Sequence, residues 1–465
     1  MLYPEKDSRT QKTATYILAV SAVLVSIIHF YIYEHFWFLR LLGLDIYSPK
    51  INYVFLLPLF SIAVIYQVVV LIKTEHGERI SKNGKQLAVT AFLYFVSIIF
   101  SVIFHELDSG FLIIIKHSFY LFIPVMLSLS VFVLYRDNED IKRTVFVLFL
   151  LGIIFSAYAV LLRFKIMADI TSYYDVFSMD GKTWASSGTS YLFRFSVPGV
   201  GPTNFPSMLI PLILASIYFY RNSDGKMRYF YLVSTLFLFL NIIITSTRGA
   251  FISLLIGMLY LLVKGWFKSK KPLSAILIFT SIVLIFFVVG HGLLYRLGLT
   301  AYQFVPFIGE GNGIGELAEK GISNGYGIDD IEEGKNRGML LVNAVQHADP
   351  IFGLGFSGLS SHVMYVDVLT RGGLVLLVPL VFFIFSIYRN SSEILRKKLY
   401  KDAFSKDLGI VLIAIFLSYT VEQMFMPAFV NNYWIWFGFA AAWARNCEME
   451  YQAQAKVSGA GTTQV

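Results

Sequence analysis

The chain has 465 residues, of which 56% are hydrophobic and 15% are charged, and its mean hydropathy is +0.66. Soluble domains carry about a quarter charged residues, so this composition excludes an ordinary water-soluble enzyme and indicates a membrane protein. The net charge of +8 does not indicate a nucleic-acid partner, because most lysines and arginines lie in short segments between apolar runs. The single cysteine, Cys447, excludes an intrachain disulfide and a cysteine-based zinc site.

Apolar runs along the chain have the length that a transmembrane helix needs, which is about 20 residues. They predict an all-α, polytopic membrane protein with about 12 transmembrane helices. We expect residues 1–450 to form a single integral membrane domain and residues 451–465 to form a flexible cytoplasmic tail. The runs centre on residues 14–33, 52–72, 88–104, 117–135, 144–162, 206–220, 229–245, 250–267, 272–292, 373–388, 408–426 and 429–445.

Basic clusters follow alternate apolar runs. They are Lys6, Arg9 and Lys12 before the first run, then Lys73, Arg79, Lys82 and Lys85, then Arg136, Lys142 and Arg143, then Arg221, Lys226 and Arg228, then Lys264, Lys268, Lys270 and Lys271, and finally Arg389, Arg396, Lys397, Lys398, Lys401 and Lys406. Cytoplasmic loops carry an excess of Lys and Arg, so this pattern predicts a multi-pass protein of the bacterial inner membrane with both termini in the cytoplasm.

The remaining loops are then extracytoplasmic, and two of them are long. They cover residues 163–205, rich in Ser, Gly and Tyr, and residues 293–372, which contain Gly clusters and several acids. Long irregular loops between compact helices are functional or disordered. Aromatic side chains in the second loop, such as Tyr302 and Phe304, predict partial order against the membrane surface.

Arg248 lies in the short segment between the runs 229–245 and 250–267, on the predicted outer side. A guanidinium can snorkel to the lipid headgroups from such a position. However, basic residues are less expected outside, and the neighbouring Gly249 and Ala250 permit close backbone approach. A guanidinium there suits bidentate binding of a lipid-linked phosphate, so we favour a functional role.

Arg194 precedes a turn that contains Pro198, Gly199, Pro202 and Asn204 and leads into the run 206–220. The Gly and Pro spacing predicts a shaped turn. An ordinary loop arginine and a functional arginine remain equally good interpretations of these residues.

The third candidate region extends from Arg337 to Gly373. Its second histidine, His362, lies just before the run 373–388, near the predicted outer membrane surface. A side chain with a near-neutral pKa can take or give a proton there, although a lone histidine is more often structural. His347 lies in the same region, and the residue pattern alone does not separate the two.

Other polar or glycine-rich positions give weaker indications of a functional site. Glu422 is a carboxylate inside the run 408–426, and a functional role and a satisfied hydrogen bond between helices are equally good interpretations. A run of alternating glycines resembles a phosphate-binding loop, but no predicted strand precedes it and no Lys-Ser/Thr pair follows it. These glycines are Gly309, Gly311, Gly313 and Gly315. The acidic residues have no metal-ligand spacing with histidine, so we predict no metal.

At these residues the chain resembles the O-antigen polymerase and O-antigen ligase superfamily of bacterial membrane glycosyltransferases. The resemblance rests on the Thr-Arg-Gly-Ala sequence at Arg248, on Arg194 with the following Pro-Thr-Asn, and on a late outer loop. That loop carries Arg337, the sequence Pro-Ile-Phe-Gly-Leu-Gly from Pro350, His362, and a Gly-Gly pair before a helix. The resemblance implies a helical membrane fold of the GT-C type and an enzyme that uses no cofactor.

The resemblance also implies substrates and residue roles. The substrates are oligosaccharides on undecaprenyl diphosphate, and the reaction is inverting glycosyl transfer without a metal at the outer face of the membrane. Arg248 and Arg337 would contact the donor diphosphate, Arg194 the diphosphate or glycan, and His362 the acceptor hydroxyl. Membrane lipids and a chain-length-regulating co-polymerase are the other expected partners. Family members often have Asn after this histidine, most regularly the ligases, whereas this chain has Val363.

These observations favour a surface polysaccharide polymerase over three alternatives. A ligase would use the same donor and transfer the glycan to lipid A–core. A lipid-linked oligosaccharide transporter often shows repeated halves and broken helices around a midplane site, whereas this chain places its polar residues in two unequal outer loops. A scaffold protein has no need of arginines and a histidine at the outer ends of its helices.

Overall fold

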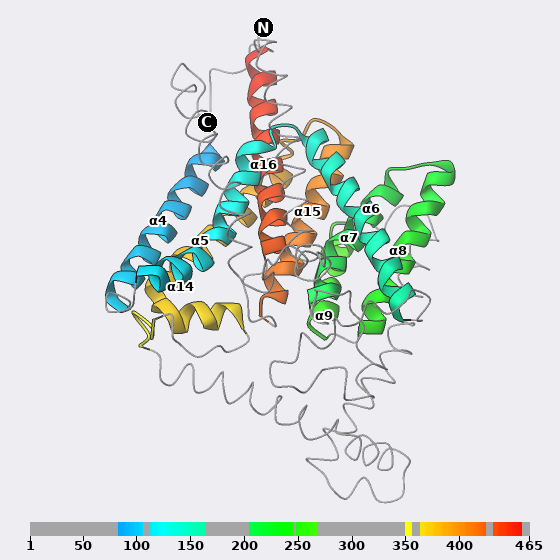
Figure 1. Cartoon of the computed structure of the whole chain (residues 1–465). Helices are drawn as coiled ribbons and strands as arrows, with labels where there is room; N and C mark the ends of the chain where they lie inside the picture. Colours follow the sequence, from blue (N-terminus) through cyan, green and yellow to red (C-terminus); the bar gives the residue numbers. More distant parts are fainter. Residues whose placement is uncertain are drawn as a thin grey trace, which may run out of the picture. The chain divides into compact units, whose positions relative to one another are not determined.

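The computed structural model describes residues 82–105, 111–163, 204–245, 248–266, 349–355, 363–424 and 431–457. These residues form α-helices and connecting turns and contain no strand (Figure 1). The helices are α4 (Lys82–His105), α5 (Phe111–Leu134), α6 (Asn138–Arg163), α7 (Asn204–Arg221), α8 (Gly225–Thr245), α9 (Arg248–Val263), α14 (Met364–Lys397), α15 (Ala403–Glu422) and α16 (Asn431–Val457).

The described helices coincide with the apolar runs. Three of them contain segments long and apolar enough to cross a membrane, namely Asn83–Ser101, Met364–Lys397 and Ala403–Glu422. Shorter apolar segments lie at Pro124–Val133, Phe205–Arg221 and Gly249–Val263. The all-α prediction is therefore confirmed for the described residues, and the helices have the character of a membrane protein. The predicted runs 14–33, 52–72 and 272–292 lie outside the described residues.

The chain separates into two compact units. The first contains Met1–Leu148 and Asn343–Val465, and the second contains Phe149–Val342. In the first unit α4 packs along α14, while α16 packs against α5, α14 and α15. In the second unit α7 packs against both α8 and α9. Each unit is thus held together by helices that neighbour one another in space but are not all consecutive in sequence.

The core of the first unit lies between α16 and its neighbours. Trp434, Trp436 and Trp443 on α16 are each at most 1% exposed. Close approach depends on glycine, because a Cβ added at Gly409 would lie 2.0 Å from the Trp443 ring. The Trp443 indole N–H donates to the carbonyl of Ser405 over 2.9 Å, so this large aromatic group is buried with its polar atom satisfied.

One end of the first unit brings three predicted basic clusters together. The Asn83 amide at the start of α4 donates to Glu448 of α16 over 3.5 Å. Asn138 at the start of α6 donates to Ser405 Oγ of α15 over 3.5 Å. The Lys142 ammonium lies 5.6 Å from the centre of the Phe404 ring. The clusters around Lys82, Arg136 and Arg396 therefore occupy the same end, as the alternating pattern of charges predicted.

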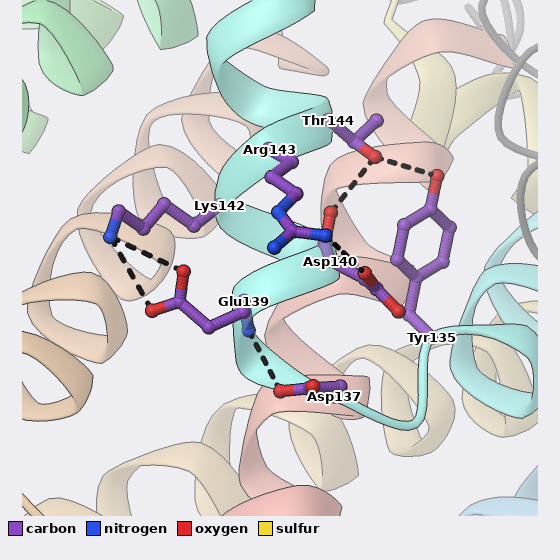
Figure 2. Close-up of polar contacts among 7 residues, drawn as sticks. All are labelled: Tyr135, Asp137, Glu139, Asp140, Lys142, Arg143 and Thr144. Atoms are coloured by element: carbon purple, nitrogen blue, oxygen red, sulfur yellow. Dashed lines mark hydrogen bonds and ion pairs between the residues drawn. The ribbon is translucent and has the colours of Figure 1, made fainter. Parts of the chain in front are cut away.

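The turn from α5 to α6 shows how this end is ordered (Figure 2). The carboxylate of Asp137 accepts a hydrogen bond from the backbone N–H of Glu139 over 3.0 Å, which caps α6. Glu139 also pairs with Lys142 at 3.4 Å, one turn along the helix. Thr144 contacts the Tyr135 hydroxyl over 3.1 Å. The acidic residues in the first turn of α6, Glu139 and Asp140, suit the positive end of the helix dipole.

The second unit has a corresponding basic end. Arg221, the last residue of α7, donates from Nη1 to the Trp266 carbonyl over 2.7 Å, and its guanidinium lies 5.0 Å from the Trp266 ring. The cluster that follows the run 206–220 therefore meets the chain that follows α9. Helix α8 begins at this end and finishes at Thr245, so Arg248 begins α9 at the opposite end of the unit.

Candidate functional site

The predicted site residues fall mostly outside the described residues. Arg194, Arg337 and His362 lie outside them. Arg248 is described as the first residue of α9, but nothing is described of its side chain. The described residues closest in sequence to His362 are residues 349–355 and the start of α14. These two segments form the candidate site that the structure can define.

Residues 349–355 form a tight turn that Asp349 organises. The Asp349 carboxylate accepts hydrogen bonds from the backbone N–H groups of Ile351 and Phe352, over 2.7 and 3.1 Å. The Asp349 carbonyl accepts from the Gly353 N–H over 2.8 Å. Aspartate commonly binds backbone amides two residues ahead, and proline at the next position presets the turn. The Asp-Pro sequence therefore accounts for the local shape.

Helix α14 is broken at Gly373, where the backbone has φ 61° and ψ −162°. Such a break leaves carbonyls of the first half and N–H groups of the second half without helical partners. The turn 349–355 supplies those partners. The N–H groups of Leu354 and Gly355 donate to the carbonyls of Thr370 and Arg371, over 2.6 and 3.0 Å.

The same contact satisfies the second half of the helix. The Leu374 N–H donates to the Pro350 carbonyl over 2.9 Å, and the Val375 N–H donates to the Ile351 carbonyl over 3.2 Å. We call this contact between residues 349–355 and the break in α14 the glycine joint. Its four hydrogen bonds engage backbone groups on both sides of the break. These groups are therefore not left without hydrogen-bond partners.

Two glycines make the glycine joint sterically possible. A Cβ at Gly373 would lie 2.0 Å from the Ile351 carbonyl oxygen, and a Cβ at Gly353 would lie 2.6 Å from the Arg371 carbonyl carbon. Both residues also have positive φ angles, which L-residues with side chains rarely adopt. The Gly-Leu-Gly and Gly-Gly sequences thus have a shared structural purpose.

Helix α4 covers the glycine joint. The Phe104 ring stacks on Phe352 with ring centres 4.7 Å apart. A Cβ at Gly372 would lie 3.0 Å from Ser101 Oγ. The joint is therefore packed between α14 and the end of α4 that lies away from the basic clusters.

A second contact holds the first turn of α14, and we call it the α15 anchor. The Met364 N–H donates to the Gln423 carbonyl over 3.1 Å. The Tyr365 hydroxyl lies 3.3 Å from both Gln423 Oε1 and the Thr420 carbonyl, and it donates to them. Val363 precedes the helix without a side-chain cap, so the end of α15 fixes the position of this turn.

Two carboxylates are buried close to the α15 anchor in the sequence. Glu422 is 1% exposed and Asp367 is 3% exposed. Glu422 is the last residue of α15, and both interpretations of this buried carboxylate, a functional and a structural one, stay open. The described part of the chain contains no group of three or more metal-ligating side chains, and the absence of a metal stays a prediction.

No protein-family model matches this chain, and no curated protein sequence matches it either. The site must therefore be interpreted from its own residues. Sequence reasoning singled out the Pro-Ile-Phe-Gly-Leu-Gly segment and the Gly-Gly pair, but it did not predict that they bind each other. It missed Tyr365 and Gln423, because neither lies in a recognisable motif and their contact joins residues that are distant in sequence.

Proposed function

We propose that the protein is a surface polysaccharide polymerase of the bacterial inner membrane. It would join repeat units carried on undecaprenyl diphosphate by inverting glycosyl transfer at the outer face, without a metal. The glycine joint is the observation that supports this proposal best. It joins two parts of the sequence resemblance, the segment from Pro350 and the Gly-Gly pair, by hydrogen bonds. In the sequence, one of these parts precedes His362 and the other follows it.

Arg248 gives independent support. It begins α9 at the end of the second unit opposite Arg221 and Trp266, which belong to the basic and predicted cytoplasmic end. An arginine at the opposite end is unexpected from the positive-inside rule. Binding of a diphosphate on the outer side explains why a guanidinium would be retained there.

The chemistry assigns a role to each proposed residue. The acceptor hydroxyl attacks the anomeric carbon of the donor while the bond between that carbon and the diphosphate oxygen breaks. His362 takes the hydroxyl proton as general base. Arg248 and Arg337 stabilise the negative charge that develops on the leaving diphosphate, and Arg194 contacts the diphosphate or glycan. The products are the extended lipid-linked chain and free undecaprenyl diphosphate.

The broken helix α14 does not favour a transporter. Transporters use the free backbone groups of broken helices to bind ions and substrates. Here four backbone groups at the break are already bonded to the turn 349–355, so they cannot bind a solute without dismantling the glycine joint.

The polysaccharide profile of a deletion strain tests the proposal. A polymerase defect leaves a single repeat unit on lipid A–core. A ligase defect removes the O-antigen and accumulates lipid-linked polymer, and an unchanged lipopolysaccharide profile directs the search to another surface polysaccharide. Purified protein in liposomes should lengthen lipid-linked repeats without added divalent metal; failure to do so, with the lipid A–core acceptor supporting transfer instead, would replace polymerase by ligase.

A further inference from the structure

The basic end of the second unit is built around the last turn of α7. Arg221 is the final residue of α7, and its guanidinium lies 5.0 Å from the centre of the Trp266 ring. The preceding residue, Tyr220, accepts a hydrogen bond from Nη2 of Arg228 on α8 over 3.1 Å. The Arg228 guanidinium also lies 4.6 Å from the centre of the Tyr220 ring. Two guanidinium groups therefore meet at adjacent residues of α7, each of them beside an aromatic ring.

A third cation follows α9. The Lys264 ammonium lies 5.4 Å from the centre of the Tyr260 ring. The backbone N–H groups of Gly265 and Trp266 donate back to the last turn of α9, and Gly265 has a φ of 74°. This is the Schellman pattern of a helix C-terminus, so backbone hydrogen bonds fix where Trp266 contacts α7. We call these three cations the α7 basic cluster, which consists of Arg221, Arg228 and Lys264.

The basic ends of the two units differ in how their charge is balanced. In the described part of the second unit, neither Arg228 nor Lys264 forms an ion pair with a carboxylate. Asp224 is close to them in sequence, but it is exposed in the turn before α8. In the first unit, basic residues pair with carboxylates one helical turn away, and these pairs are Lys142–Glu139, Arg143–Asp140 and Lys397–Glu393. Positive charge in the α7 basic cluster is therefore available to an anion from outside the chain.

Apolar side chains surround this charge. Tyr229 and Phe230 on α8 are 68% and 40% exposed, and Val263 at the end of α9 is 74% exposed. Aromatic side chains concentrate at the interface between membrane and water, and basic pockets between helices on the cytoplasmic side bind anionic lipid headgroups. Cations next to exposed apolar groups match a ligand that carries a phosphate next to acyl chains.

We propose that the α7 basic cluster binds the phosphate headgroup of an anionic phospholipid of the inner membrane. Arg221 and Arg228 donate to the phosphate oxygens, Lys264 adds positive charge, and the acyl chains lie against the exposed apolar side chains of α8 and α9. The guanidinium groups are already held beside aromatic rings, so little side-chain freedom is lost on binding. This site lies at the end of the second unit opposite Arg248, and it does not depend on glycosyl transfer.

The test uses the full-length protein purified in detergent, with bound phosphatidylglycerol counted by native mass spectrometry. Phosphatidylcholine, which carries no net charge, is the comparison. Each removed cation should weaken phosphatidylglycerol binding about five-fold, so Arg228→Gln combined with Lys264→Gln should weaken it about 25-fold. Phosphatidylcholine binding should not change. Unchanged phosphatidylglycerol binding in this double variant would overturn the proposal.

The matched control removes the same number of charges from the first unit. Lys142→Gln combined with Arg143→Gln changes two cations that are already paired with carboxylates. This control should retain most of the wild-type binding of phosphatidylglycerol. Equal weakening in the two double variants would show that the lipid responds to net charge and not to the α7 basic cluster, and it would overturn the site.

Two single variants separate charge from packing. Tyr220→Phe removes the hydrogen bond to Arg228 but keeps the ring and every cation, so it should weaken phosphatidylglycerol binding less than Arg228→Gln does. An equal loss in these two variants would show that the contact between α7 and α8, and not the positive charge, controls binding. Lys264 is exposed, so Lys264→Gln does not disturb the core. This variant should lose about five-fold in affinity even if the double variant fails to fold.

Inorganic phosphate distinguishes a lipid headgroup from a free ion. Since the acyl chains contribute to binding, inorganic phosphate at the same concentration should not displace phosphatidylglycerol from the wild-type protein. Displacement by inorganic phosphate would identify a site for free phosphate and would overturn the assignment to a lipid.

Discussion

Arg248 illustrates how a single side chain can be tested for geometry as well as charge. It is the first residue of α9, and we proposed above that it binds a lipid-linked diphosphate. Arg248→Lys and Arg337→Lys keep the positive charge but lose the planar pair of donors that grips a phosphate. We predict a severe loss of chain extension in both variants at normal membrane levels. Arg143→Lys is the control, because the Arg143 side chain is 76% exposed. Wild-type activity in all three variants would show that Arg248 and Arg337 do not bind the diphosphate through their guanidinium geometry.

The two histidines of the late loop give a second prediction. Removal of a general base lowers the rate by about 10²–10⁴-fold, so His362→Ala should abolish most chain extension. His347→Ala should have little effect, because His347 precedes the Asp349 turn in the sequence, whereas His362 comes just before the start of α14. Turnover is compared on lipid-linked repeats with membrane levels matched. A selective loss in His347→Ala would transfer the catalytic role to that residue.

Glu450 gives a prediction about pH, at a position five residues beyond the apolar run 429–445. Burial raises the pKa of Glu450 above its ordinary value, as do the carboxylates of Asp137 and Asp402, while Lys401 opposes them. A raised pKa in the folded state means that stability is present at low pH and is lost as the pH rises through that pKa. Removal of the charge should therefore stabilise the protein at neutral pH.

The measurement is the Tm of Glu450→Gln in detergent across the pH range. Glu450→Gln should have the higher Tm at pH 7.5, and the difference should disappear as the pH falls below the ordinary value of 4.5. Glu139→Gln is the control, since the Glu139 side chain is 56% exposed. A lower Tm for Glu450→Gln than for the wild type at pH 7.5 would contradict the prediction that the ionised Glu450 carboxylate destabilises the folded protein.

At the scale of elements, α16 caps the end of α5. The Arg445 guanidinium donates to the carbonyls of Phe132 and Tyr135, and Asn446 donates to the Tyr135 carbonyl over 3.1 Å. The last carbonyls of a helix have no partners within that helix. These donors satisfy them, and the guanidinium stacks 4.7 Å from the centre of the Phe132 ring.

Arg445→Met should therefore destabilise the first unit. A hydrogen bond to a charged group contributes about 1.5–3 kcal/mol, and Arg445 is 8% exposed, so solvent cannot replace it. We expect a clear fall in Tm, with Arg445→Lys intermediate because it retains one charged donor. Arg143→Met, at an exposed position, should leave Tm unchanged. Equal Tm values for Arg445→Met and wild type would show that the guanidinium does not hold α5 and α16 together.

Element ends also show where tertiary contacts alter local expectations. Helix α14 begins at Met364, before the predicted apolar run 373–388, because the glycine joint lets two half-helices follow each other across Gly373. Helix α16 continues to Val457, into the segment expected to be a flexible tail. Gln452 donates to Glu448 one turn earlier over 3.4 Å, which supports the helix beyond the apolar run.

At the scale of the whole molecule, the basic ends of the two units lead to a prediction of topology. Residues 163–205 and 293–372 should be extracytoplasmic, and both termini should be cytoplasmic. In a Cys447→Ser background, Ser187→Cys and Asn324→Cys should react with an impermeant maleimide in intact spheroplasts. Asn222→Cys, in the turn between α7 and α8, should react only after the membrane is opened. Protection of both Ser187→Cys and Asn324→Cys would overturn this topology.

The sequence by itself determined the helical membrane character, because apolar side chains and basic clusters act locally through lipid and charge. The described helices coincide with the predicted runs, and the basic clusters around Lys82, Arg136 and Arg396 share one end, as alternation required. The predicted roles of Arg194, Arg248, Arg337 and His362 stay predictions, since their side chains lie outside the described part of the chain.

Only the tertiary structure decided that Gly353 meets Arg371 and that Gln423 holds the start of α14. Both contacts join residues that are not neighbours in the sequence; the glycine joint consists of backbone hydrogen bonds, and the α15 anchor contains one between Met364 and Gln423. Backbone donors and acceptors are nearly the same for every residue type, so their pairing leaves no pattern in the sequence. Glycines mark where two backbones can approach closely, but the identity of the partner is set by how the helices pack.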